Sequence, residues 1–384
     1  MASRDPIDES APKQAGPNSS GSQTSPIALI DTQTPLDEFS KLISASPWVA
    51  IDTEADSLRS YPDKLCLIQV SIPEGDFLID PLAGVEMGSL LDAFRNRELL
   101  FHGADYDLRL LRRTYGFMPS RVFDTMLAAR LIGLTEFGLA ALVQRYFNVQ
   151  LTKSAQKADW RQRPLPKLML EYATKDSHYL HALSNLLREQ LEAKGRLAWH
   201  EQLCARSVAD AATDAPVDVD ECWRIKGSHK LSPKAQAVLR ELWHWREREA
   251  LEASKPPFFI LAHDMLVGLA ANAAARGVDA VAFPHFLRER RRAAAHAAIV
   301  EGLALPEDKW PGQLRPRGRR LSWSEGERME RLRVHRDAVA AKLELDPSLV
   351  ATRSDLAGLA VDWAQQAKEM MPWQVELMRS EKLR

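Results

Sequence analysis

Two carboxylates close a short apolar run near the start of the chain. Residues 48–51 read Trp-Val-Ala-Ile, and Asp52, Thr53 and Glu54 follow directly. Because alternate residues of a β-strand point to opposite faces, Asp52 and Glu54 project from one side of a strand while Thr53 points into the layer behind. Two carboxylates on one face can share a metal ion, so this pair indicates metal-dependent chemistry.

Two further acidic blocks follow in order along the chain. Residues 102–108 contain Asp105 and Asp107, and charge alone does not choose between them. Tyr172 precedes Asp176 by four residues, so on a helix the phenol and the carboxylate lie side by side. Each block alone is ordinary, since an Asp after a strand often caps a turn. Their ordered occurrence predicts one site of four acids, in which Tyr172 orients a water molecule.

The chemistry that suits such a cluster is phosphodiester hydrolysis. This reaction needs an activated water and a stabilised leaving oxygen, and two divalent ions about 4 Å apart can supply both. Carboxylates without Cys or His ligands favour Mg²⁺ or Mn²⁺ over Zn²⁺. His102 is an alternative catalytic group, but a histidine just after a short strand is more often a structural residue. We therefore expect carboxylate and metal chemistry.

The elements that must position these acids can be read from the apolar pattern. Strands are predicted at residues 27–30, 48–54, 65–71, 76–80 and 99–101, and helices at residues 34–45, 89–95, 107–115, 124–131, 139–147 and 168–194. Strands dominate the beginning of this region and helices its end. The pattern predicts an α/β or α+β core, residues 26–205, with a mixed sheet flanked by helices.

The remainder of the chain is predicted to be all helical. Ser232 followed by Pro233 is a typical helix start, with Ser as the N-cap and Pro at the first helical position. We expect one helical domain over residues 223–303, with helices near 237–250, 263–275 and 284–299. A linker rich in Pro, Gly and Arg, residues 304–323, precedes a second helical domain over residues 324–384. Residues 1–25 are polar and are predicted to be a disordered tail.

Composition narrows the class of protein further. Lys and Arg number 51 against 52 Asp and Glu, so affinity for nucleic acid must come from local basic patches. Cys66, Cys204 and Cys222 are too few for a disulfide framework, and no apolar stretch has the roughly twenty residues of a membrane span. The acidic N-terminus resembles neither a signal nor a transit peptide. We predict a cytoplasmic monomer, with no nucleotide-hydrolysing motor because the motifs for one are absent.

The three acidic blocks resemble the motifs of the DEDD superfamily of 3′-to-5′ exonucleases, in the subgroup with tyrosine in the third motif. Within it the chain is most similar to the ribonuclease D family. Trp243, Trp245 and the double proline Pro256-Pro257 resemble the HRDC domain that follows the nuclease core in that family. The stretches between the motifs that carry the resemblance are residues 61–69, 123–125, 153–154 and 159–165.

This resemblance implies an α/β ribonuclease-H-like exonuclease core followed by all-α HRDC-type helical bundles. It selects Asp107 over Asp105 and implies that Asp52 bridges two divalent ions, that Glu54 and Asp176 complete one site, and that Asp107 serves the other. Tyr172 would position the attacking water. The implied activity is removal of nucleotides from RNA 3′ ends, with tRNA precursors among the substrates.

Basic residues must contact the RNA phosphates, which supply most of the affinity. The candidates are Lys153 and Arg163, near the third motif, and Arg317 and Arg319 in the predicted linker. Two other functions stay open at this point: a 3′-to-5′ DNA exonuclease, and an RNA-binding scaffold with a silent nuclease core. The presence of all four acids and the tyrosine favours an active enzyme, and the HRDC-like appendage favours RNA.

Overall fold

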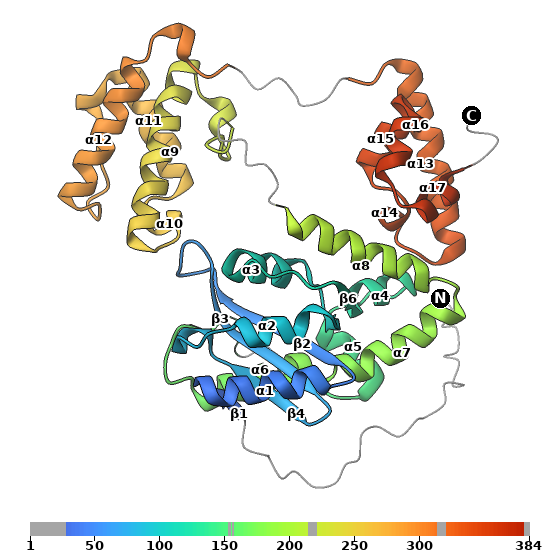
Figure 1. Ribbon diagram of the computed structural model, residues 1–384. Helices are drawn as coiled ribbons and strands as arrows, with labels where there is room; N and C mark the ends of the chain where they lie inside the picture. The colour runs from blue at the N-terminus through green and yellow to red at the C-terminus, as the bar shows by residue number, and fades with distance from the viewer. Residues whose placement is uncertain (1–27, 153–154, 156, 214–220, 313–319, 380–384) are drawn as a thin grey trace, which may run out of the picture.

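The computed structural model describes residues 28–152, 155, 157–213, 221–312 and 320–379. They form an α/β domain and two helical regions (Figure 1). The predicted tail, residues 1–25, lies outside the described residues. No helix in the described part of the chain is long and apolar enough to cross a membrane.

One mixed sheet forms the centre of the first domain. Its strands lie in the order β1-β4-β3-β2-β5-β6. The central strand β2 is antiparallel to β3 and parallel to β5, which in turn is parallel to β6. On the other side β3 is antiparallel to β4, and β4 is parallel to β1. The strands are β1 (Ala28–Ile30), β2 (Val49–Asp56), β3 (Lys64–Ile72), β4 (Gly75–Ile79), β5 (Glu98–Phe101) and β6 (Arg121–Asp124).

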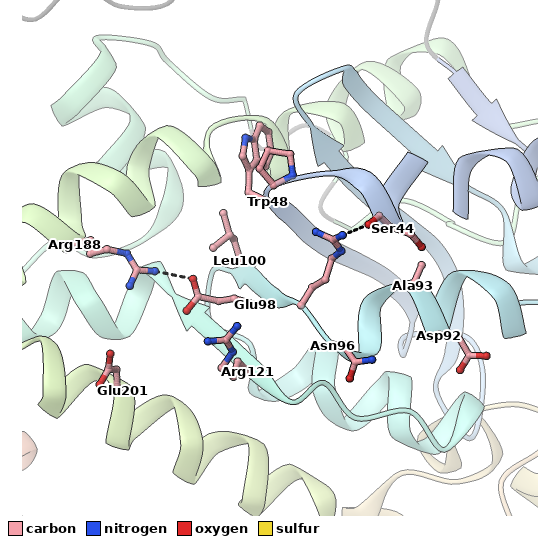
Figure 2. A pocket seen from close by; sticks show the side chains of 12 residues that line it. Ser44, Trp48, Asp92, Ala93, Asn96, Glu98, Leu100, Arg121, Arg188 and Glu201 are labelled. Carbon is pink, nitrogen blue, oxygen red and sulfur yellow. Dashed lines mark hydrogen bonds and ion pairs between the residues drawn. The ribbon is translucent and has the colours of Figure 1, made fainter. Parts of the chain in front are cut away.

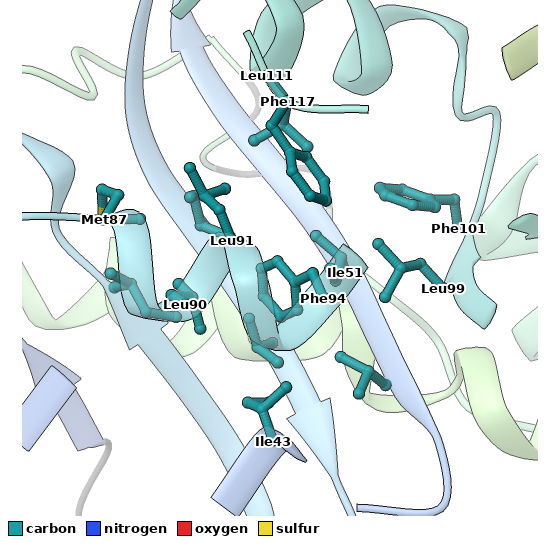
Figure 3. Close-up of a cluster of buried hydrophobic side chains, with 14 of the residues drawn as sticks. Ile43, Ile51, Met87, Leu90, Leu91, Phe94, Leu99, Phe101, Leu111 and Phe117 are labelled. Carbon is teal, nitrogen blue, oxygen red and sulfur yellow. The ribbon is translucent and has the colours of Figure 1, made fainter. Parts of the chain in front are cut away.

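Alternation along β2 assigns its residues to two different cores. Ile51 packs with Leu99 and Phe94 in a cluster formed by α1, α2, α3 and one face of the sheet (Figure 3). Ala50 belongs to a second cluster with Leu180 and residues of α4 and α7 on the opposite face. The helices of this domain are α1 (Gln33–Ala45), α2 (Gly88–Arg95), α3 (Asp105–Tyr115), α4 (Thr125–Leu131), α5 (Leu139–Phe147), α6 (Lys167–His178), α7 (Leu180–Ala193) and α8 (Leu197–Ala212). The predicted mixed sheet flanked by helices is therefore confirmed.

Three local predictions differ from the structure. The helix predicted over residues 168–194 is two helices, α6 and α7, which meet at Tyr179. Tyr179 keeps right-handed helical angles (φ −87°, ψ −7°), so neither Gly nor Pro marks the junction in the sequence. Strand β6 was not predicted, and its last residue, Asp124, was assigned to the helix predicted over residues 124–131. Helix α8 extends past residue 205, and its Ala211 is buried in the core with α1, α2 and α3.

The two helical regions have cores of their own. Ser232 caps α9 by accepting a hydrogen bond from the Ala235 amide, as its position before Pro233 predicts. The first region contains α9 (Pro233–Ala253), α10 (Pro257–Ile260), α11 (His263–Arg276) and α12 (Glu289–Ala304), which begins five residues later than predicted. The second contains α13 (Trp323–Leu343), α14 (Pro347–Val350), α15 (Arg353–Val361), α16 (Trp363–Glu369) and α17 (Pro372–Met378).

Candidate active site

Strand β2 presents two acids to the face of the sheet that α6 covers. Asp52 and Glu54 alternate with Ile51 and Thr53, which belong to the opposite face. Antiparallel pairing with β3 and parallel pairing with β5 hold β2 on both edges. The backbone of the two acids is therefore fixed by the centre of the sheet.

Helix α6 brings the third acid to this pair. Asp52, Glu54 and Asp176 each offer a carboxylate oxygen, and these three oxygens lie within 4.8 Å of one another. Tyr172, one turn earlier on α6, lies close enough for its hydroxyl to lower the pKa of the Asp176 carboxyl. The phenol and carboxylate thus lie side by side, as their spacing predicts.

Asp107 reaches the site from α3, on the other face of the sheet. Its side chain is buried, with 6% of the residue exposed, and its Oδ1 accepts a hydrogen bond of 2.5 Å from Thr53 Oγ1. Asp105 is exposed and pairs with Arg109 at 3.1 Å. The structure therefore joins Asp107, and not the exposed Asp105, to strand β2 through Thr53, while the oxygens that lie within 4.8 Å of one another are those of Asp52, Glu54 and Asp176.

The carboxylate of Asp124 fixes the start of α3 through hydrogen bonds to four backbone amides. The Asp124 carboxylate accepts hydrogen bonds from the amides of Gly103, Ala104 and Met126 at 2.8 to 2.9 Å, and from the Leu127 amide at 3.3 Å. It therefore joins the loop before α3 to the first turn of α4. Gly103 has φ +78°, which favours glycine, and a Cβ there would lie 3.2 Å from the Met126 side chain.

His102 lies in the same loop but has a structural partner. Its Nδ1 lies 2.9 Å from Thr125 Oγ1, and Thr125 in turn donates to the Phe101 carbonyl at 3.0 Å. Burial lowers the pKa of His102. The expectation that this histidine is structural is consistent with these contacts.

The acids on β2 resist ionisation because they are buried together. Burial raises the pKa of Asp52 well above its usual range, and repulsion from Asp107, Asp176 and Glu54 raises it further. Burial, followed by repulsion from Asp176 and Asp107, raises the pKa of Glu54 to about 9. A bound cation would reverse this effect by favouring the ionised forms.

The two acids on helices show smaller shifts in the same direction. Burial raises the pKa of Asp107 to about 6, against the opposing effect of the Thr53 hydrogen bond. Burial raises the pKa of Asp176 to about 6, and the Tyr172 hydroxyl opposes this shift. Tyr172 has a strongly raised pKa, first through burial and then through the nearby Asp176 charge. Its phenol is therefore protonated at neutral pH.

The donor set suits hard divalent cations. All four groups offer carboxylate oxygens, the ligands that Mg²⁺ and Mn²⁺ prefer, and the buried negative charge requires compensation. Asp52, Glu54 and Asp176 are close enough to hold one cation together.

A pocket of about 750 Å³ lies at the other end of the central strands (Figure 2). Arg97, Arg121 and Arg188 line it together with three acids, and Arg188 pairs with Glu98 at 2.7 Å. Its charges balance, and its lining includes none of the four acids of the three motifs. The pocket therefore has no part in the candidate site.

Comparisons with known proteins agree with this geometry. A 3′-5′ exonuclease family model matches residues 27–192, and an HRDC domain model matches residues 235–276. Ribonuclease D of Jannaschia sp. is 31% identical over 344 residues, which cover 86% of this chain and 88% of that protein. The chain belongs to the ribonuclease D family.

Other relatives of the ribonuclease D family extend the comparison. The crystal structure of Escherichia coli RNase D superposes with a TM-score of 0.73 at 25% identity, covering 93% of this chain and 97% of that one. Exosome complex component 10 homolog of Caenorhabditis elegans is 32% identical over 279 residues, but the match spans only 31% of its length. As a member of the ribonuclease D family the chain is a hydrolase, a 3′-to-5′ exoribonuclease.

The predicted HRDC region is confirmed by the family match over residues 235–276. An HRDC character of the second helical region stays a prediction, and so do the exact domain boundaries.

The RNA-contacting candidates need one correction. Arg163 donates to both Asp80 oxygens at 2.5 and 2.6 Å, and to the carbonyls of Cys66, Trp160 and Gln162, each at 2.8 Å. These bonds use all five of its N–H donors. Arg163 therefore fixes the segment before α6 to the sheet and is not placed to bind RNA. Lys153, Arg317 and Arg319 lie outside the described residues.

Proposed function

We propose that this ribonuclease D family member uses two divalent cations, Mg²⁺ or Mn²⁺, to hydrolyse the terminal phosphodiester at RNA 3′ ends. The observation that carries the proposal is the convergence of Asp52, Glu54 and Asp176 within 4.8 Å, with Asp107 joined to Thr53 beside them. Bound cations would supply the activated water and stabilise the leaving oxygen.

Each acid has a position that suits a distinct role. The charges of Asp107 and Asp176 both raise the pKa of Asp52, so Asp52 suits the role of an acid shared between two cations. Glu54 and Asp176 would complete one cation site, and Asp107 would serve the other. Tyr172 is protonated at neutral pH, so we propose that it orients the attacking water by hydrogen bonding and does not act as a base.

We further propose that the substrates are structured RNAs with a single-stranded 3′ end, tRNA precursors among them. The E. coli structure is described as an exoribonuclease involved in structured RNA processing, and it resembles this chain over nearly its whole length. Lys153, Arg317 and Arg319 remain candidates for the phosphate contacts. A cytoplasmic location and a monomeric state also remain predictions.

The decisive experiment is digestion of a 5′-labelled RNA with a 3′ tail, and of its DNA counterpart, with Mg²⁺, Mn²⁺ or EDTA. We expect a metal-dependent ladder of shortened RNA, slower shortening of DNA, and no ladder with Asp52→Asn. Equal rates on DNA would replace the RNA substrate by DNA. Tight RNA binding without shortening would make the chain a scaffold.

A further inference from the structure

One polar side chain beside the acids has no partner. On β3, Leu67, Gln69 and Ser71 alternate on the face that α6 covers. Ser71 Oγ donates to Asp76 at 2.5 Å and lies 2.8 Å from Ser177 Oγ. Gln69 is completely buried, yet neither its amide nitrogen nor its amide oxygen has a hydrogen-bond partner among the described residues.

The sheet register places this amide next to the first catalytic acid. Gln69 on β3 is the direct cross-strand partner of Asp52 on β2. Directly opposed residues of an antiparallel pair share a face, with Cβ atoms about 4.5–5.5 Å apart. Helix α6 covers the same face and brings Asp176 within 4.8 Å of Asp52. The Gln69 amide is therefore enclosed at the edge of the acid cluster.

An unpaired buried amide is unfavourable, and a Leu would fill this part of the core without that penalty. The buried amide is explained if it forms its hydrogen bond only when the cations are bound. An ionised carboxylate has about four acceptor positions, and a cation leaves some of them free. A neutral N–H donor can occupy one of these without competing with the cation for charge.

We propose that Gln69 is a positioning residue whose Nε2 hydrogen-bonds the Asp52 carboxylate when the cations are bound. This inference rests on the proposed function of the four acids. Groups that hydrogen-bond a metal ligand fix its orientation, and their loss typically weakens metal binding 10- to 100-fold.

The test uses the full chain without RNA, so that cation binding is measured apart from turnover. Mn²⁺ is titrated calorimetrically into the wild type, Gln69→Met and Gln69→Leu, and the thermal midpoint of each is recorded in EDTA. We expect both variants to keep or raise the midpoint and to bind Mn²⁺ about tenfold more weakly. In digestion assays at fixed Mn²⁺, kcat should fall while KM for RNA is unchanged.

Ser71→Ala is the matched control, because Ser71 is a polar residue on the same face of β3 whose partners are Asp76 and Ser177. It should lower the thermal midpoint and leave the Mn²⁺ affinity unchanged. Wild-type Mn²⁺ affinity in both Gln69 variants would overturn the inference. Loss of the native circular dichroism spectrum in both would also overturn it, by giving the amide a role in folding. Failure of the wild type itself to bind Mn²⁺ would instead overturn the proposed two-cation function.

Discussion

At the scale of single residues, the site concentrates negative charge in a buried space. The carboxyls of Asp52, Glu54 and Asp176 lie within 4.8 Å of one another with raised pKa values, and the buried Asp107 raises the pKa of Asp52 further. This arrangement opposes folding without metal and favours cation binding, because only a cation can offset the repulsion. The same residues should therefore control both stability and metal affinity.

The first prediction concerns Asp176→Asn in EDTA. Burial raises the pKa of Asp176 to about 6 in the folded protein, above its unfolded value of about 4. The folded protein thus holds this proton more tightly, and the stability that the protonated form contributes is present below about pH 4 and lost as the pH rises through about 6. Removing the charge should stabilise the metal-free protein by about 1–2 kcal/mol at pH 8, and much less at pH 4 to 5.

Thermal unfolding from pH 4 to 9 measures this difference. With saturating Mn²⁺ the order should reverse, because the wild type gains more from the cation than the variant does. An equal response of both proteins to pH in EDTA would show that burial does not raise the pKa of Asp176 in the folded protein.

The second prediction concerns the Tyr172 hydroxyl. Tyr172→Phe should lower kcat about 10²-fold, the range for a group that positions a reacting water, while Mn²⁺ affinity changes little. Because burial strongly raises the pKa of Tyr172, no loss of rate from its ionisation is expected up to pH 10. Single-turnover digestion across this pH range tests both points. Tyr146→Phe is the control, since that hydroxyl bonds only Gln190 among the described residues, at 3.2 Å.

At the scale of elements, one N-cap positions two helices. Asp124 caps α4 and also accepts from the loop that begins α3, so it couples the start of α4 to the position of Asp107. An asparagine has only one acceptor oxygen and must lose at least one of these bonds.

The third prediction follows from this coupling. Asp124→Asn should destabilise the protein by about 1–3 kcal/mol and also lower kcat, because α3 and Asp107 lose their fixed position. Asp362→Ala, at the N-cap of α16, removes a helix cap in the second helical region. Chemical denaturation and digestion rates of both variants provide the comparison. If the two variants lose stability and neither loses rate, Asp124 is only a cap.

At the scale of the whole molecule, the end of β2 and the turn that follows it contact the HRDC region, α3 and the segment before α6. Tyr61 donates to Glu247 of α9 at 2.7 Å and packs against the HRDC core. Asp63 of the same turn accepts from Tyr106 of α3 at 3.1 Å. Asp56 pairs with Arg161 at 2.7 Å, in the segment before α6. The placement of the HRDC region is thus linked to both helices that carry candidate catalytic acids.

The fourth prediction tests this link. Tyr61→Phe removes the bond to Glu247 and should raise KM two- to tenfold for a tailed hairpin RNA, a loss of about 0.5–1.4 kcal/mol typical of one hydrogen bond. Digestion of a trinucleotide, which has no hairpin for the HRDC region to contact, should be unchanged. Glu252→Gln is the control, because Glu252 lies on the same helix and pairs with Arg290 of the HRDC region. Equal losses on both substrates would place the effect in the active site itself.

The acids, the order of the motifs and most of the helices and strands could be predicted from local sequence patterns. Alternation predicted that Asp52 and Glu54 share a face, because the period of a strand is a local property. The spacing of Tyr172 and Asp176 predicted their contact for the same reason on a helix. Ser232 with Pro233 predicted the start of α9 from local capping chemistry alone.

Features that depend on contacts between distant segments could be recognised only in the folded chain. The bond from Thr53 to Asp107 joins residues 54 positions apart and separates Asp107 from the exposed Asp105. The five bonds of Arg163 turn a candidate for RNA binding into a structural residue, because its partner Asp80 comes from another part of the sheet. In the sequence Gln69 is one polar residue within an apolar strand. Only the strand register shows that it lies opposite Asp52. The local sequence pattern determines on which face of an element a side chain lies. Strand order and helix packing determine which residues it contacts there.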